Sequence, residues 1–290
     1  MACTIASEHG IAQSACSVNG LFEGYGSGTS WNYPNAPAGA DTSRTNLIGN
    51  GLGYLDYNCG LINVQGGVGL TDYFPYTYNY KSGAYGYNMA EIYGHGEGDV
   101  FLRDPQKYAL GVGLDYQLDN FTKTGYGTKL GVNTNQFSNW LEPMAFGEYY
   151  LNDAVTLGAV ADYRSGSSAD QVSSSTMQSY GFSAYVNYYV TPNLRVGLRG
   201  SNNDVTSQFT GYAEYDTNFS GKLGAIYKVE DSPISLFTNV IYAANNYTYS
   251  ALYSPTANSS IEGTVGFRLD IGPHANRSLV ESDRNGVYLH

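Results

Sequence analysis

The chain has 290 residues, only 13% of them charged, and a formal net charge of -11 at pH 7. This negative charge disfavours nucleic-acid binding and attachment to anionic lipid through basic residues. Gly, Asn, Ser and Thr recur every few residues, which argues against long helices, and no segment approaches the apolar run of a transmembrane helix. The mean hydropathy of -0.30 is nevertheless compatible with membrane-spanning strands, because these alternate apolar and polar residues.

The first hundred residues predict four strands separated by turn signals. The expected strands are Val18–Gly28, Leu47–Tyr57, Leu61–Leu70 and Tyr87–Leu102. A polar, Pro-containing loop is expected at Trp31–Thr42, and a loop dense in Tyr at Asp72–Gly83. The first of these strands has only a weak pattern, whereas the last is long and leads directly into a hairpin.

The clearest strand signal lies in the hairpin Val100–Leu118, which turns at Asp104-Pro105-Gln106-Lys107. One face of its return arm carries large residues: Tyr108, Leu110, Val112, Leu114, Tyr116 and Leu118. The other face carries small or polar residues: Ala109, Gly111, Gly113, Asp115 and Gln117. This alternation predicts a strand. Aromatic residues that bracket an aliphatic band, opposite a small polar face, are what a membrane-spanning barrel strand needs.

The rest of the chain predicts further strands joined by two kinds of connection. The expected strands are Leu141–Leu151, Ala154–Arg164, Tyr180–Val190, Leu194–Asn203, Phe219–Val229, Ile234–Ala244 and Ser260–Ile271. Short turns alternate with long polar connections, which are expected near 72–83, 119–139, 165–177, 204–218 and 245–259. This asymmetry is typical of outer-membrane barrels, which have tight periplasmic turns and long external loops.

These patterns predict an all-β fold, a single antiparallel, up-and-down transmembrane β-barrel of the bacterial outer membrane. The expected number of strands is about twelve, within a range of roughly ten to fourteen. The chain divides into an N-terminal segment 1–17, a barrel 18–272 and a polar C-terminal tail 273–290. The competing fold is a secreted soluble β-sandwich, in which each apolar row would face a second sheet and the polar rows would carry more charge.

The three cysteines, Cys3, Cys16 and Cys59, leave at least one thiol outside an intrachain disulfide. A Cys16–Cys59 bond would tie the first strand to the second hairpin, and a Cys3–Cys16 bond would close a small N-terminal loop. Three free thiols are the remaining alternative. The N-terminus lacks a basic region followed by an apolar one, so it is not a complete secretory signal.

Three segments carry a resemblance to a known family. GEGDVFLRDPQKYALGVGLDY resembles the hairpin of a porin-like outer-membrane β-barrel family common in alphaproteobacteria, in which an aromatic-Arg-Asp-Pro turn joins two such strands. FGEYYLNDAVTLGAVADY is similar to the next hairpin of that family, and VGFRLDIG with RSLVESDR resembles its last strand and short charged tail. The resemblance covers Gly96–Tyr163 and Ser260–Arg284. It implies the outer membrane of a Gram-negative bacterium and a porin-like barrel, and says more about architecture than about activity.

Charged residues opposite the apolar rows are the candidates for lining the lumen. They are Asp99, Arg103, Asp115, Glu148, Asp162, Arg195, Arg199, Glu262 and Arg268. Rings of such charges can select ions in a channel, or they can form salt bridges that fill a narrow barrel. The expected function is passive diffusion of small hydrophilic solutes or ions. The alternative is a non-conducting structural or surface-interaction barrel that assembles with itself or binds partners through Tyr-rich external loops.

His95, Glu97 and Asp99 share one face of the Tyr87–Leu102 strand and are weak candidates for a metal site or a proton relay. Same-face strand positions are about 6.6 Å apart, which is far for three adjacent ligands of one ion. The alternative is a polar row that pairs with basic residues across the lumen. The sequence has no nucleophile–base set, no G-x-S-x-G and no phosphate loop. It therefore predicts neither an enzyme nor a cofactor.

The expected partners are outer-membrane lipid and small hydrophilic solutes, with no nucleic acid. Ala159, Ala161 and Ala184 lie on outward rows and form a flat patch that could support a homo-oligomer or a lattice. Simple lipid contact is the alternative. Tyr residues in the expected loops, such as Tyr76 and Tyr249, indicate either a surface that binds sugars or proteins or loops that pack against each other.

Overall fold

The structure is a computed structural model that describes residues 16–32, 43–59, 62–80, 83–104, 106–126, 134–169, 174–209, 212–249, 256–273 and 275–284. The strands are β1 (Ser17–Asn32), β2 (Ser43–Cys59), β3 (Ile62–Tyr80), β4 (Gly83–Asp104), β5 (Tyr108–Tyr126), β6 (Thr134–Asn152), β7 (Val155–Ala169), β8 (Ser174–Thr191), β9 (Leu194–Phe209), β10 (Tyr212–Lys228), β11 (Ile234–Tyr249) and β12 (Thr256–Ile271). One short helix follows, α1 (Leu279–Arg284).

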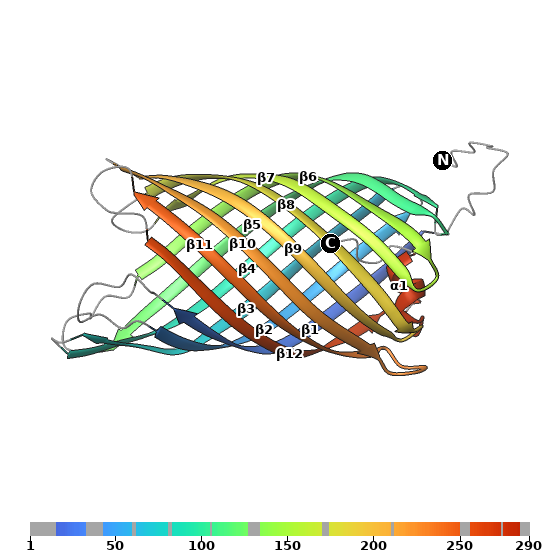
Figure 1. Cartoon of the computed structure of the whole chain (residues 1–290), viewed down its shortest axis with the longest axis horizontal. Helices are drawn as coiled ribbons and strands as arrows, with labels where there is room; N and C mark the ends of the chain where they lie inside the picture. The colour runs from blue at the N-terminus through green and yellow to red at the C-terminus, as the bar shows by residue number, and fades with distance from the viewer. Residues whose placement is uncertain are drawn as a thin grey trace.

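The strands form one closed antiparallel barrel (Figure 1). Each strand pairs with its neighbours in sequence, and β1 pairs with β12 in the register Gly20↔Ile271 to close the ring. Closure leaves no free sheet edge, which is the condition for strands to cross a bilayer. The predicted all-β, up-and-down barrel of about twelve strands is therefore confirmed.

The exterior of the barrel is apolar because large side chains alternate with small or polar ones along each strand. On β5, Leu110, Val112 and Leu114 are 53%, 59% and 48% exposed, whereas Ala109 between them and the turn is fully buried. Exposed apolar side chains occur on every strand. No second sheet covers these rows in the part of the chain that the structure describes, so the β-sandwich alternative is wrong. A surface of this kind is stable only against lipid.

Tight turns at one end of the barrel, called the short-turn end, use the residues that the sequence indicated. The backbone N–H of Lys107 donates to the carbonyl of Asp104 at 2.9 Å, and that of Gln106 donates to the Asp104 side chain at 3.0 Å. At the next turn, the N–H of Ala154 donates to the Asn152 side chain at 2.8 Å. Side-chain acceptors of this type stabilise two-residue turns.

Outward tyrosines gather close to the short-turn end: Tyr57, Tyr108, Tyr149, Tyr188 and Tyr227. Such a girdle is typical of the lipid–water interface of a barrel. Tyr54 does not belong to this girdle, because its ring lies inside the barrel, over Gly67 and 4.7 Å from the ring of His95. The adjacent residue Leu55 is 67% exposed and points outward. Because successive side chains of a strand point to opposite faces, Tyr54 has to point inward.

The segments expected as long loops are mostly strand. β3 continues to Tyr80, β5 continues to Tyr126, and residues 204–218 belong to β9 and β10 apart from the undescribed pair 210–211. The prediction was wrong because it equated polarity with irregular backbone. The backbone groups of Ser, Thr, Asn and Tyr form the hydrogen bonds of a strand ladder as well as those of apolar residues do. Polar composition therefore does not by itself end a strand.

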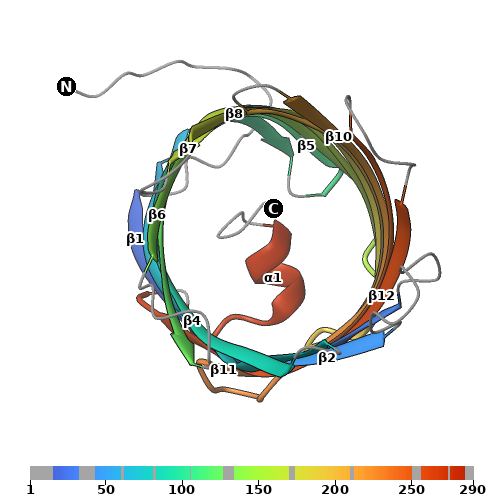
Figure 2. The same ribbon diagram turned by 90° about the vertical axis from the view of Figure 1, so that its left-hand side faces the viewer.

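Cys16 and Cys59 form a disulfide with a Cα–Cα distance of 4.2 Å, which joins the start of β1 to the end of β2. This was one of the alternatives left open by the sequence, and Cys3 lies outside the described residues. After β12 the chain folds back, and Figure 2 shows α1 inside the ring of strands. No helix in the described part of the chain is long and apolar enough to cross a membrane.

Candidate functional site

The candidate site is the lumen, the interior lined by every second side chain of each strand. The residues predicted to line it all lie on inward faces: Asp99 and Arg103 on β4, Asp115 on β5, Glu148 on β6, Asp162 on β7, Arg195 and Arg199 on β9, and Glu262 and Arg268 on β12. Asp99, for example, is 3% exposed and its neighbour Val100 is 57% exposed. Their role in selecting solutes stays a prediction.

The lumen has two sides of opposite charge. The acidic wall is formed by β2 and β4–β7 and carries Asp56, Glu97, Asp99, Asp115, Asp119, Glu142, Glu148 and Asp162. The basic wall is formed by β9, β10 and β12 and carries Arg195, Arg199, Lys222, Lys228 and Arg268. The separation is not complete, because Arg103 and Arg164 lie on the acidic wall. Carboxylates also lie on the strands of the basic wall: Glu214, Asp216, Glu262 and Asp270.

Sequence reasoning missed two cations of the basic wall, Lys222 and Lys228. The signal was present, since both alternate with the outward residues Leu223 and Tyr227 of β10. This strand was expected only as Phe219–Val229, and the prediction named no charged residue on its inward face. The omission matters because these two lysines have very different surroundings.

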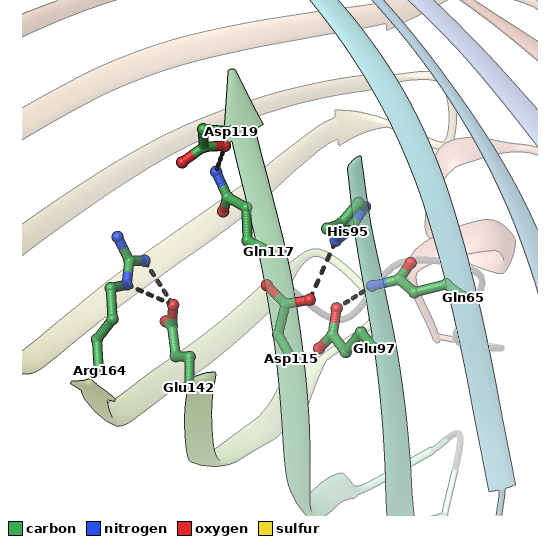
Figure 3. Close-up of polar contacts among 8 residues, drawn as sticks. All are labelled: Gln65, His95, Glu97, Asp115, Gln117, Asp119, Glu142 and Arg164. Carbon is green, nitrogen blue, oxygen red and sulfur yellow. Dashed lines mark hydrogen bonds and ion pairs between the residues drawn. The ribbon is translucent and has the colours of Figure 1, made fainter. Parts of the chain in front are cut away.

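Polar groups on the acidic wall are joined in pairs (Figure 3). The pairs are Gln65–Glu97, His95–Asp115, Gln117–Asp119 and Arg164–Glu142. His95 Nδ1 lies 3.3 Å from Asp115 Oδ1 on the next strand, and Arg164 Nε donates to Glu142 Oε2 at 2.7 Å. Cross-strand pairs of complementary groups stabilise a sheet. These contacts satisfy part of the acidic wall, whereas His95 Nε2 and the Nε and Nη2 atoms of Arg103 are buried without a hydrogen-bond partner among the described residues.

The weak metal-site candidates are not brought together as ligands. In the described part of the chain, no three His, Cys, Asp or Glu side chains are placed to hold a metal ion. His95 instead contacts Asp115, and Glu97 accepts a hydrogen bond from Gln65. The geometry fits the alternative, a row of paired polar residues. The partners lie on neighbouring strands, however, and not across the lumen as that alternative expected.

An apolar cluster of inward side chains lies on the acidic wall near the short-turn end. Its buried members are Phe101, Ala109, Phe146, Tyr150 and Val160, with Met144 and Tyr185 packed against them. The ring of Phe146 lies over Gly111, where a Cβ atom would overlap it. The Arg103 guanidinium stacks on Phe101 at 4.4 Å from the ring centroid. This packing narrows the lumen on one side.

The basic wall instead borders a cavity of about 240 Å³. Its lining includes Arg195, Arg199, Lys222 and Arg268, the amides Asn187 and Asn239, and the carboxylates Glu23, Glu148 and Asp283. Arg268 Nη2 lies 3.2 Å from Glu23 Oε2, and Lys228 pairs with Asp270 beside the cavity. This cavity therefore lies against the cations of the basic wall.

Helix α1 is anchored at the short-turn end by charged contacts. The Asp283 carboxylate accepts hydrogen bonds from Arg195 Nη1 and the Tyr189 hydroxyl, both at 2.6 Å. Arg284 Nη2 donates to the carbonyl of Asn152 at 2.5 Å, and its Nη1 lies 3.3 Å from the Asp153 carboxylate. These contacts tie the C-terminal segment to three strand ends and place it across part of the lumen.

The sequence of α1 explains why so short a helix forms there. Ser278 and Glu281 make a capping box, in which the Ser278 Oγ accepts from the Glu281 N–H at 3.3 Å and Glu281 accepts from the Ser278 N–H at 3.2 Å. Leu279 is 3% exposed and packs on Tyr189 and Ile226. Since six residues are too few for a stable isolated helix, docking in the lumen supplies the rest of its stability.

No family model and no curated protein matches this chain. Its fold is similar to the translocator domain of the autotransporter NalP from Neisseria meningitidis, at 8% identity and a TM-score of 0.54 over 87% of this chain and 88% of that one. The COG4313 outer membrane channel from Pseudomonas putida F1 matches at 11% identity and 0.52, over 92% and 100%. The beta domain of the Bordetella autotransporter Brka matches at 10% and 0.51, over 86% and 98%.

These likenesses concern the fold, because the sequence identities are low. They agree with what the barrel shows by itself, an apolar exterior, an aromatic girdle and a polar interior. The chain is a twelve-stranded β-barrel of the bacterial outer-membrane type, and the outer membrane is its location.

Proposed function

We propose that this protein is a channel through which small hydrophilic solutes or ions diffuse passively. The observation that carries the proposal is the polar, charged lumen with a cavity of about 240 Å³ against the basic wall. Inward charges are expensive to keep in a barrel interior unless they are paired or hydrated. Arg199 and Lys222 have no carboxylate partner among the described residues, so hydration of the lumen supports a path for water and solutes.

Helix α1 is the part of this channel that limits passage at the short-turn end. It is held by the Asp283–Arg195 pair, whose side chains are 18% and 27% exposed. A partly buried ion pair of this kind is weaker than a fully buried one, since solvent screens it. The proposed channel is therefore restricted by α1 and becomes wider when α1 leaves its place.

Planar-bilayer recording of pure, folded protein tests the proposal. We expect discrete channels from the full chain, and larger ones from a variant that ends at Gly272 and lacks α1. A substitution in the exposed turn, Lys107→Gln, is the matched control, because its side chain is 71% exposed and lies outside the lumen. If neither the full chain nor the shortened barrel conducts although both are folded, the channel function is wrong.

The second candidate function is a closed barrel with a structural or surface-interaction role. The observation that favours it is the filled short-turn end, where α1 and the apolar cluster around Phe101 and Phe146 narrow the lumen. Swelling of protein-loaded vesicles in small sugars separates the two functions. A closed barrel gives no swelling with or without α1, whereas a channel restricted by α1 swells faster once it is removed.

The finer assignment to the porin-like family of alphaproteobacteria is part of the same proposal. It is supported by the hairpins 96–116 and 146–163, which form paired strands β4–β5 and β6–β7 with the expected short turns. The tail RSLVESDR of that resemblance contains α1.

A further inference from the structure

We propose that the basic wall holds a binding site for a small free oxyanion, such as inorganic phosphate, between Arg199 and Lys222. The inference deepens the proposed function, because it gives the channel a class of solute that it binds. The site stands on three observations: the register of the two cations, their lack of a carboxylate partner, and the cavity in front of them.

The register places the two cations side by side. Lys222 on β10 pairs directly with Arg199 on β9, and both side chains are directed into the lumen. Directly paired strand residues have Cβ atoms about 4.5–5.5 Å apart, and like charges in this arrangement destabilise a sheet. An anion bound between them would reverse this repulsion.

Neither cation forms a close ion pair with a carboxylate in the described part of the chain, and Glu23 and Glu262 act on Lys222 only from a longer distance. Arg199 Nη2 donates to the Ser183 hydroxyl at 2.7 Å, and its guanidinium lies 5.9 Å from the Tyr185 ring centroid. Lys222 makes no hydrogen bond or ion pair with any described residue. The other cations of the basic wall differ, since each has a carboxylate: Arg195 with Asp283, Arg268 with Glu23, and Lys228 with Asp270.

The carboxylates that border the cavity are already engaged and leave the pair free for a ligand. Glu148 accepts hydrogen bonds from the hydroxyls of Tyr185 at 2.6 Å and Tyr150 at 3.1 Å. Glu23 and Asp283 are held by Arg268 and Arg195. The Asp283 carboxylate also shows how this wall receives an oxyanion, because it is bound by a guanidinium and a hydroxyl together.

The chemistry of the pair and the size of the cavity define the ligand. A guanidinium offers several N–H donors in a plane and an ammonium offers a compact charge, and both favour phosphate or carboxylate oxygens. The amides of Asn187 and Asn239 line the same cavity and supply further donors. A cavity of about 240 Å³ is large enough for a small oxyanion with some water.

Direct binding of inorganic phosphate to the full chain in neutral detergent tests the site. Phosphorus NMR line broadening, measured at constant ionic strength, should show saturable binding. Arg199→Gln and Lys222→Gln should each weaken it at least about ten-fold, because each removes one charge-assisted contact. Arg164→Gln is the matched control, since it removes a lumen cation that pairs with Glu142 on the acidic wall, and it should leave binding unchanged.

Two further results would overturn the site. One is binding that is equally strong in Arg199→Gln, Lys222→Gln and the unaltered protein. The other is a lower thermal unfolding midpoint for Lys222→Gln, because removing one of two opposed like charges should keep or raise stability. The same unfolding measurement also shows whether Lys222→Gln is folded when its binding is measured.

The binding experiment also separates this site from the channel function. Detergent-solubilised barrel binds phosphate whether or not it conducts. Binding that Lys222→Gln abolishes, without channels in bilayers, supports the site and contradicts the channel. If the protein forms channels but does not bind phosphate, the binding site is wrong and the channel function stands. When both hold, added phosphate should reduce chloride current through the unaltered protein and not through Lys222→Gln.

Discussion

The two walls of the lumen carry comparable numbers of charged groups but use them differently. On the acidic wall, the directly paired carboxylates Glu97, Asp115 and Glu142 each have a complementary partner nearby. These partners are Gln65, His95 and Arg164. On the basic wall, two like charges meet at Arg199 and Lys222, and a cavity lies in front of them. A complementary partner within reach, and not register alone, therefore decides whether a charge supports the structure or is free to bind a solute.

Two lysines of the basic wall, Lys222 and Lys228, should show the effect of such a partner most strongly. Lys228 is 1% exposed and paired with Asp270, so Lys228→Gln leaves a carboxylate without its cation and should cost about 3–5 kcal/mol of unfolding free energy. Lys222→Gln should cost nothing or stabilise slightly. Urea unfolding in detergent measures both. Equal losses would show that a carboxylate partner does not distinguish the two lysines.

Glycines on the two walls should respond differently to an added methyl group. At Gly111 on the acidic wall a Cβ atom would overlap the Phe146 ring and lie 2.8 Å from the Phe101 Cβ, so Gly111→Ala should cost about 1–3 kcal/mol. At Gly197 on the basic wall its nearest neighbour is the Asn187 side-chain oxygen at 2.6 Å, which can rotate into the cavity. Gly197→Ala should therefore cost less. A larger drop in unfolding midpoint for Gly197→Ala than for Gly111→Ala would contradict this prediction.

The smallest effect on stability is expected from substitutions on the outer surface of the barrel, which change neither wall of the lumen. Ala159 pairs with Ala184, and the same outward row continues to Gly147 and to Gly200, so small residues run across β6–β9. If this row is a contact between barrels, Ala159→Leu with Ala184→Leu should loosen the assembly and leave the barrel folded. Native mass spectrometry measures the oligomeric state. A monomer before and after the change would exclude the wall contact.

Much of the site was predictable because a strand has a period of two. Once Leu110, Val112 and Leu114 are outward, Ala109, Gly111 and Asp115 have to be inward. The same reasoning applied to β10 would have found Lys222. What alternation cannot give is the neighbour across the strands, because register depends on where two distant segments begin to pair.

By itself, the sequence determined the strands, their faces, the short turns and a barrel of about twelve strands, since these depend on local alternation and turn residues. Tertiary structure decided the rest. It extended strands through polar segments such as 204–218, where the ladder and not polarity sets the strand ends. It placed the tail in the lumen, because α1 is stable only when Leu279 and Asp283 reach Tyr189 and Arg195. It also set Arg199 beside Lys222, which follows from the register between β9 and β10 and from no feature of either strand alone.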